Sequence, residues 1–546
     1  MVKRKWDANR IDKSDYARLI VSALIWVFMS ALFVVYPLYF KNGYESIASH
    51  KYRFYFLLME YFLVTLLAIM MVAASIWGFS KDALKNGKPF YLLVAVLTFY
   101  LLTNALSFIF SDYKLIRNEQ LNKDIPWFIK GALFGDKGWY MGLVTIVIMT
   151  LCTLVTGFIW NYSDKVFILI FLGSLPVTIW GLLNRYDIYP IKMKHSSETF
   201  ISTLGNVDWF SGYLSIVAPL AYGLYLVSQS KVKRYVLAFL SFIFIHMTVV
   251  SGAESGIFSL LVTYLIMLAI AIKDPLKLSQ VGKLLTIFLT VLVYIRLIDI
   301  FFPDTRTLKE GISEVMISTP FICLLAVITI SLHLLLYLLG KRRSEYPTIL
   351  KKRGSSIVLL CGLFVTLTVI ALMVVNTYVK RLPIIGESPY FNLGMRWGST
   401  RGVCYYLAVK IFSKEGFIHK LFGVGPDSFS YALYSHDDLS VISREYLWKL
   451  RLTNAHNELL TVLVNEGIVG VISFALMWIV FIWQAIKGIS KNPLSSVFLL
   501  IFVSYLSNNM FSFRQVESTP FVYAIMGIFM AMLVKVHKVD KSGAKD

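Results

Sequence analysis

Charged residues are scarce in this chain of 546 residues, in which Asp, Glu, Lys and Arg together make up only 16%. Hydrophobic residues make up 57%, and the mean hydropathy is +0.67. A soluble globular protein of this length would need far more charge to cover its surface. The composition therefore excludes that class and predicts a protein that lies mostly within a lipid bilayer.

Cysteine is also scarce, with four residues in the whole chain. Cys152, Cys323 and Cys361 fall within apolar runs, and Cys404 lies just outside one. Neither their number nor their spacing is typical of a disulfide framework or of a set of metal ligands.

Acidic residues are outnumbered by basic ones, 32 against 53, which gives a formal net charge of +21. The basic residues are scattered through short connections rather than gathered in one patch, so we expect no nucleic-acid partner. They are better explained by membrane topology and by attraction to anionic lipid heads. Membrane lipids are therefore predicted partners.

Long apolar runs are what the sequence does contain. Runs of about 20 apolar residues recur, and each is long enough to cross a hydrocarbon core roughly 30 Å thick. Because backbone groups inside such a core must satisfy their own hydrogen bonds, the runs are predicted to be helices. The pattern predicts an all-α polytopic membrane protein with about fourteen transmembrane helices. The predicted spans are 17–40, 54–79, 89–110, 139–158, 166–183, 208–228, 235–250, 256–272, 284–300, 320–339, 357–375, 467–483, 493–506 and 520–536.

Basic residues in the short connections predict the orientation of the chain. They gather in residues 3–13, 81–88, 231–234, 341–353 and 535–545. With an even number of spans, all five segments fall on one side of the membrane, which is then the cytoplasmic side. We therefore predict a multi-pass protein of a bacterial cytoplasmic membrane, with both termini in the cytoplasm.

One long connection remains, residues 376–466, and by the same parity it faces outward. A long insertion in a compact membrane protein is usually functional. We divide the chain into a bundle of about 11 helices at 1–375, this extracytoplasmic loop with short helices, and about three helices with a cytoplasmic tail at 467–546. The loop lacks an Asp-x-Asp motif, so we expect neither a metal ion nor any other cofactor.

Three stretches of this loop carry candidate site residues. In GMRWGSTRGVCYYLAVKIFS, residues 394–413, Arg396 and Arg401 precede an amphipathic helical pattern. Each could grip a phosphate through two parallel hydrogen bonds, helped by backbone N–H groups at a helix start. Alternatively, both lie among the lipid head groups. In KLFGVGPDSFSYAL, residues 420–433, Gly423, Gly425 and Pro426 are predicted to make a tight turn. Asp427 either caps the segment that follows the turn or serves the site, as a substrate contact or an acid–base group.

The third stretch is RLTNAHNELLTVLVNEGIVG, residues 451–470, where His456, Asn457 and Glu458 run directly into an apolar helix. Asn457 and Glu458 are candidate substrate-binding residues beside His456. Ionisable groups near membrane depth are costly, so they tend to be kept for function. His456 could bind phosphate as a cation or accept a proton from an attacking hydroxyl. The alternative is a capping cluster, in which Asn454 caps the helix and His456 is simply satisfied at the interface.

The order of these patches resembles the O-antigen ligase and polymerase superfamily, multi-span enzymes of bacterial surface polysaccharide assembly. Four stretches carry the likeness. STLGNVDWFSGYLSIVAPL is similar to the family's Gly-Asn…Gly-Tyr-Leu…Pro-Leu segment. RGVCYYLAVKIFS followed by LFGVGPDSF is similar to its Arg-Gly…Gly-x-Gly-Pro-Asp-x-Phe segment, and AHNELLTVLVNEGIVG is similar to its His-Asn-x-x-Leu…Glu-Gly signature.

The resemblance implies a GT-C-like membrane fold and an inverting, metal-independent glycosyltransferase. Such an enzyme moves a glycan from a polyprenyl-diphosphate carrier to an acceptor hydroxyl at the outer face of the membrane. The glycan-linked carrier and a glycan, lipid or cell-wall acceptor are the implied partners. The family's essential Arg and His correspond to Arg401 and His456.

One position departs from the family pattern. Where the family often has an Arg-containing turn, this chain has SGAESG, with Glu254 in the Arg place. The resemblance then implies that another cation contacts the diphosphate, with Arg185, Lys194 and Arg396 as candidates. Ligases and chain polymerases share these motifs, so a polymerase remains an alternative. A flippase or other transporter of lipid-linked oligosaccharides is an alternative from a different class.

Overall fold

The computed structural model describes residues 13–77, 87–114, 131–136, 139–307, 309, 311–341, 346–383, 385–386, 388–448 and 450–543. Several expectations fall outside these residues, namely the basic segment before residue 13, the end of the second predicted span at Phe79, and the basic residues Lys81, Lys85, Arg342 and Arg343. Within the described residues the chain is mostly helical, with two strands of two residues each.

The elements follow in chain order, with η marking a π-helical turn. They are α1 (Lys13–Ser30), η1 (Ala31–Val35), α2 (Tyr36–Leu38), α3 (Ile47–Trp77), α4 (Lys88–Phe110), α5 (Leu143–Ile159), α6 (Val166–Arg185), β1 (Phe200–Ile201), β2 (Gly205–Asn206), α7 (Val207–Val227), α8 (Lys231–Val250), α9 (Glu254–Ala271), α10 (Pro275–Phe301), α11 (Ile312–Met316), α12 (Thr319–Lys341), α13 (Thr348–Val374), η3 (Val375–Val379), α14 (Trp397–Lys414), α15 (Phe417–Phe422), α16 (Phe429–Tyr434), α17 (Asp437–Tyr446), α18 (Glu458–Gly488), α19 (Ser495–Asn508) and α20 (Thr519–Gly543). β1 and β2 pair antiparallel, with Phe200 opposite Asn206.

Eleven helices of the described chain are long and apolar enough to cross a membrane, judged by length and composition. Three further apolar helices are shorter, Leu143–Ile159, Ser495–Asn508 and Thr519–Lys535. Each of the fourteen predicted spans coincides with one of these helices. The prediction of an all-α, multi-pass membrane protein is therefore confirmed, while its count of fourteen spans is not, because three of the predicted spans fall on the shorter apolar stretches.

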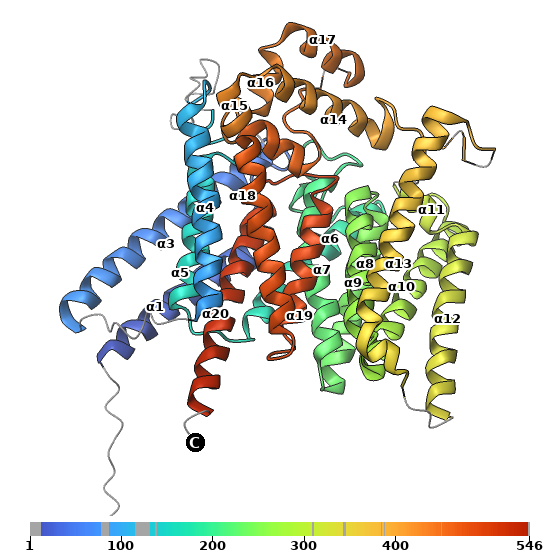
Figure 1. Ribbon diagram of the computed structural model, residues 1–546, viewed down its shortest axis with the longest axis horizontal. Helices are drawn as coiled ribbons and strands as arrows, with labels where there is room; N and C mark the ends of the chain where they lie inside the picture. The colour runs from blue at the N-terminus through green and yellow to red at the C-terminus, as the bar shows by residue number, and fades with distance from the viewer. Residues whose placement is uncertain are drawn as a thin grey trace, which may run out of the picture.

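The most buried helices lie at the centre of the bundle. α7 is enclosed along almost its whole length, with α19, α9 and α8 packed against it, while α20 packs on α5 and α18 on α4. α12 and α13 lie at one edge of the bundle and leave most of their apolar side chains exposed (Figure 1). Exposed apolar helix faces of this kind are suited to contact with lipid.

The predicted long loop forms a helical layer of its own. α14, α15, α16 and α17 lie together at one end of the bundle (Figure 1). This layer has a separate small core, in which Val403, Leu407, Phe429 and Leu433 are completely buried. The layer is therefore folded structure rather than an extended connection.

The boundary between this layer and the bundle differs from the prediction. α18 begins at Glu458, nine residues before the predicted start of the twelfth span at 467. Gly467 has φ +71° and ψ −169°, which breaks the helical geometry within α18. The predicted boundary therefore coincides with a kink that divides α18 into a short first segment and a long second one.

Candidate functional site

Arg401 lies at the start of the regular part of α14, and only 6% of the residue is exposed. Its Nη1 donates to the carboxylate of Glu254 at 2.5 Å and to the carbonyl oxygen of Gly398 at 2.9 Å. Its Nε donates to the carbonyl oxygen of Phe511 at 2.8 Å. The guanidinium is thus held between the start of α9 and the α19–α20 connection, which disfavours a place among lipid head groups.

The backbone before Arg401 is wound in the left-handed sense. Gly398, Ser399 and Thr400 have φ values of 56°, 56° and 73°. For a non-glycine residue this conformation costs about 1–3 kcal/mol, and such residues gather at functional sites. Arg396 lies before this turn and is exposed. The turn therefore separates two arginines that are five residues apart in sequence, one buried and one at the surface.

His456 lies just before α18, in a turn with φ 49°. Its backbone N–H donates to the side-chain oxygen of Asn454 at 2.8 Å, and its ring packs edge-on against Phe513 at 5.1 Å. Burial lowers the pKa of the imidazole, the carboxylate of Asp208 opposes that shift, and the charge of Arg401 adds to it. The net result is a histidine that is neutral at pH 7.

The helix cap of α18 is Asn457, whose side-chain oxygen accepts from the backbone N–H of Leu460 at 3.1 Å. Asn454 instead closes the turn that contains His456. The prediction that Asn454 is the helix cap is therefore wrong, while the capping-cluster interpretation stays open with Asn457 in that place. A capping role does apply to Asn457, which was predicted as a substrate-binding residue and remains next to His456.

The α19–α20 connection brings Arg401 and His456 together. Met510 accepts from Asn457 Nδ2 at 3.0 Å through its carbonyl oxygen, and the next carbonyl, that of Phe511, accepts from Arg401. Phe513 then packs on the His456 ring. A single stretch of four residues therefore contacts the Arg-bearing and the His-bearing segments, which are far apart in sequence.

Several helices start at this site. Glu254 is the first residue of α9, Asp208 is the second residue of α7, and His456 precedes the first turn of α18. α7 and α9 are joined there by the Ser211 and Ser255 hydroxyls at 2.8 Å. Helix starts carry partial positive charge from unpaired N–H groups and are suited to anions. The site therefore combines one guanidinium with helix starts, balanced by two carboxylates.

Two other residues were predicted to contact the diphosphate, Arg185 and Lys194, and the contacts of both in the described chain are with residues other than Arg401. Arg185 is completely buried at the end of α6, and it donates to the carbonyl oxygens of Glu198 at 2.7 Å and Ser251 at 2.5 Å. Ser251 begins the turn that leads to Glu254, so Arg185 supports that turn. Lys194 is exposed, and its backbone carbonyl oxygen accepts from Tyr44 N–H at 3.0 Å.

Glu458 points into the protein and not into the site. Its Oε2 accepts from the backbone N–H of Arg514 at 2.8 Å, and its Oε1 pairs with the Arg514 guanidinium. The same guanidinium donates to Glu466 at 2.8 Å, and Tyr100 donates to Glu466 at 3.1 Å. All four groups are buried. The structure thus gives Glu458 a partner inside the fold, beneath the backbone that carries His456.

Asp427 is also engaged within the fold. Its Oδ2 accepts from the backbone N–H groups of Asp136 at 2.7 Å and Met141 at 3.0 Å. Burial and the nearby Asp136 carboxylate raise the pKa of Asp427 well above its ordinary value. Asp427 therefore has a structural contact, but it does not cap the segment that follows it, because α16 has Ser428 at its N-cap and no side-chain cap hydrogen bond. Its contacts instead fix the approach to α5.

The two glycine-containing motifs pack directly on each other. The Val424 and Gly425 N–H groups donate to the carbonyl oxygens of Val464 and Asn465 at 3.0 and 2.9 Å. A Cβ atom on Gly423 would lie 2.2 Å from the Asn465 carbonyl oxygen. GVGPD and NEGIVG are thus two sides of one backbone junction, which fixes α18 to the helical layer.

Replacing Gly467 by Ala is expected to destabilise this junction by at least about 2 kcal/mol, because the residue has positive φ. The added Cβ would also lie 2.4 Å from the Leu421 carbonyl oxygen. The apparent melting temperature of the purified protein in detergent measures the effect. Gly416→Ala is the matched control, because a Cβ there meets nothing within 4 Å. Equal melting temperatures for the two variants would contradict the junction.

Some residues of the site were not predicted from the sequence. Asp208 was part of a quoted motif, GNVDWF, but its acidic side chain was not singled out. A carboxylate in the first turn of a helix that begins at membrane depth is the signal that could have found it. Phe511 and Phe513 gave no such signal, because one contributes a backbone oxygen and the other an ordinary apolar ring.

Comparison with known proteins gives no relative on which to rest a role: no family model matches the chain, and no curated protein matches it. Among the residues that the structure describes, no group of three or more His, Cys, Asp or Glu side chains is arranged to hold a metal ion. The site is therefore interpreted from its own geometry and from the motif resemblance.

Proposed function

We propose that this chain is a glycosyltransferase that resembles O-antigen ligases. It transfers a glycan from a polyprenyl-diphosphate carrier, such as undecaprenyl diphosphate, to an acceptor hydroxyl at the outer face of a bacterial cytoplasmic membrane. The observation that carries the proposal is the convergence of Arg401 and His456 on one short stretch, Met510 to Phe513. These are the two residues that the motif resemblance marks as essential.

Arg401 is suited to the leaving group. When the acceptor oxygen attacks the sugar carbon, the bond to the diphosphate oxygen breaks and its electron pair stays on the diphosphate. A fixed guanidinium and nearby helix starts stabilise that developing charge, an effect worth several kcal/mol in a water-poor site. Glu254 holds Arg401 at rest, and we propose that the diphosphate takes over this contact. In-line attack inverts the sugar configuration.

His456 is suited to take the proton of the attacking hydroxyl. The sequence left two roles open, a contact to the diphosphate and a general base. A neutral imidazole has the lone pair that a base needs, and the lowered pKa disfavours the protonated form that a diphosphate contact would use. We therefore propose the base role, in which the hydroxyl proton passes to His456 as the new glycosidic bond forms.

The protonation state of His456 predicts how the free energy of unfolding depends on pH. The unfolded histidine has a pKa of about 6.5, and the folded one is lower. As the pH falls below about 6.5, the unfolded state takes up the proton first, so stability decreases. At pH 5 this single group is expected to cost about 1–2 kcal/mol. The drop in melting temperature between pH 7.5 and pH 5 should therefore be smaller for His456→Gln than for the unchanged protein. An equal drop in both proteins would show that His456 is not buried in the neutral form.

The proposal includes a topology. We count the three short helices among fourteen crossings, which places both chain ends in the cytoplasm and the α14–α17 layer outside. Basic residues on the opposite end of the bundle support this orientation, for example Lys231, Lys233 and Arg234 at the start of α8.

Transfer in detergent tests the proposal directly. Purified full-length protein is mixed with an undecaprenyl-diphosphate-linked glycan and a candidate acceptor, and covalent product is measured by mass spectrometry. A flippase or other transporter forms no such product, because moving a lipid across a bilayer has no meaning in detergent. The surface glycan of a deletion strain then separates two enzymes. Free long chains indicate a ligase, while accumulated single repeat units indicate a polymerase.

A further inference from the structure

The helical layer contains a large open hollow that is separate from Arg401 and His456. It has a volume of about 810 Å³ and lies between α16, α17, Tyr113 and the segment at Leu450 and Arg451. Pockets that bind small molecules have volumes of about 300–1,000 Å³. The hollow is therefore large enough for a short oligosaccharide.

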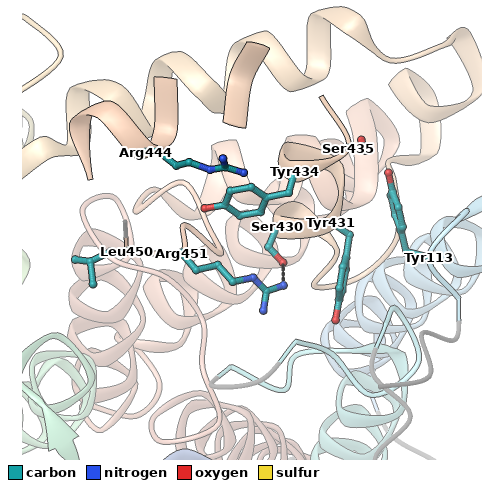
Figure 2. Close-up of a pocket in the computed structure, with 8 residues that line it drawn as sticks. All are labelled: Tyr113, Ser430, Tyr431, Tyr434, Ser435, Arg444, Leu450 and Arg451. Carbon is teal, nitrogen blue, oxygen red and sulfur yellow. Dashed lines mark hydrogen bonds between the residues drawn. The ribbon is translucent and has the colours of Figure 1, made fainter. Parts of the chain in front are cut away.

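Two arginines line this hollow, and they differ in their partners. Arg451 pairs with the completely buried Asp136 at 2.9 Å and donates to the Ser430 hydroxyl at 2.8 Å. Arg444, near the end of α17, is exposed and has no ion-pair partner among the described residues. Figure 2 shows both guanidinium groups lining the same hollow. Since Asp136 neutralises one of them, a net positive charge remains.

Three tyrosines, Tyr113, Tyr431 and Tyr434, line the hollow beside the arginines, together with Ser430, Ser435 and Leu450 (Figure 2). The Tyr113 and Tyr431 rings stack with centroids 5.8 Å apart, and the Arg451 guanidinium lies 5.6 Å from the centre of the Tyr431 ring. The Tyr434 hydroxyl accepts from the backbone N–H of Leu452 at 2.9 Å, which fixes the segment that carries Arg451. The wall therefore offers rigid aromatic surface beside a free cation.

The hollow is tied to the proposed catalytic site through a short piece of chain. Arg451 and His456 are only five positions apart in the sequence, a span of at most about 18 Å when fully extended. Thr453, midway along this piece, accepts a hydrogen bond from Trp139. A glycan whose reacting end lies at His456 could therefore reach the hollow with sugars farther along the same chain.

We propose that this hollow binds an acidic saccharide, a sugar unit that carries a carboxylate. The choice of a saccharide rests on the proposed function, and the choice of an acid rests on Arg444. The Arg444 guanidinium contacts the carboxylate through two parallel hydrogen bonds, as arginine does with planar anions. The sugar face lies against the tyrosine rings, whose hydroxyls and apolar faces suit such an amphipathic group.

Binding tests this proposal without any transfer reaction. The full-length protein in detergent is titrated with an octasaccharide of alternating glucuronic acid and N-acetylglucosamine, and with a neutral maltooctaose of the same length, by calorimetry. The acidic probe is expected to bind more tightly than the neutral one. Arg444→Gln is expected to weaken the acidic probe about tenfold, because a charge-assisted contact is lost. Lys410 is an exposed residue of α14 that lies outside the hollow. Lys410→Gln should therefore leave the binding of the acidic probe unchanged.

The outcomes separate this inference from the proposed function. Equal binding of both probes, no binding of either, or an unchanged affinity in Arg444→Gln would each overturn the acidic saccharide site. None of these results depends on whether the protein transfers a glycan. Conversely, an inactive assay with selective, Arg444-dependent binding would remove the proposed enzyme and leave the saccharide site in place.

Discussion

Arg401→Ala is expected to lower the rate of glycan transfer by roughly 10²–10³-fold, the usual loss when one fixed group that stabilises a leaving charge is removed. The residue is buried, and its Nη1 is placed 2.5 Å from Glu254, so it is positioned before any substrate arrives. The initial rate of product formation by purified protein measures the loss. Arg401→Lys keeps the positive charge but loses the planar guanidinium with its paired N–H donors, so an intermediate rate is expected.

A double variant separates this chemical role from a structural one. Arg401→Ala alone leaves the Glu254 carboxylate without its partner, which can damage the site by itself. In Arg401→Ala/Glu254→Gln that charge is also removed. If Arg401 contacts the diphosphate, the double variant stays as slow as the single one. Recovery of transfer in the double variant would mean that Arg401 only neutralises Glu254.

The helices could largely be predicted from the apolar runs, because a run of about 20 apolar residues has few alternatives to a helix. Helix ends were less predictable. The second span was predicted from residue 54, but α3 begins at Ile47 and includes Lys51. Lys51 is completely buried, and its Nζ donates to three carbonyl oxygens around the end of α2 at 2.9–3.3 Å. The sequence shows the charge of this lysine, but it does not show the carbonyl oxygens that accept its hydrogen bonds.

The site could be predicted only in part, for a similar reason. Local pattern and resemblance pointed to Arg401 and His456, and the structure brings both to one stretch of chain. The partner of Arg401 could not be predicted, since Glu254 is 147 residues away and was noted only as a departure from the family pattern. The structure gives this departure a physical account, because the acid stands opposite the guanidinium. Glu458 was predicted to contact substrate, and its contact with Arg514 depends on a loop 56 residues farther along.

Arg514→Met is expected to destabilise the protein by about 3–5 kcal/mol, the cost of leaving buried charges without their partner. Arg514, Glu458, Glu466 and Tyr100 form a buried cluster in which Arg514 carries the positive charge. Its guanidinium pairs with Glu458 and Glu466 and lies 5.6 Å from the Tyr100 ring centre. Without it, two carboxylates remain buried and repel each other. Because Glu458 begins α18, the backbone beneath His456 should loosen as well. The yield of monodisperse protein and its apparent melting temperature measure the effect.

Two comparisons make the Arg514 prediction specific. Lys414→Met breaks an ion pair with Asp438 at 2.8 Å, but both side chains are largely exposed, so little change is expected. Arg514→Met/Glu458→Gln/Glu466→Gln removes all three charges and is expected to regain much of the lost stability, because no buried carboxylate is left unpaired. If Arg514→Met melts like the unchanged protein, or if the triple variant is no better than the single one, this charge cluster does not hold the start of α18. The position of His456 would then depend on its hydrogen bond to Asn454 and on the Met510 to Phe513 contacts.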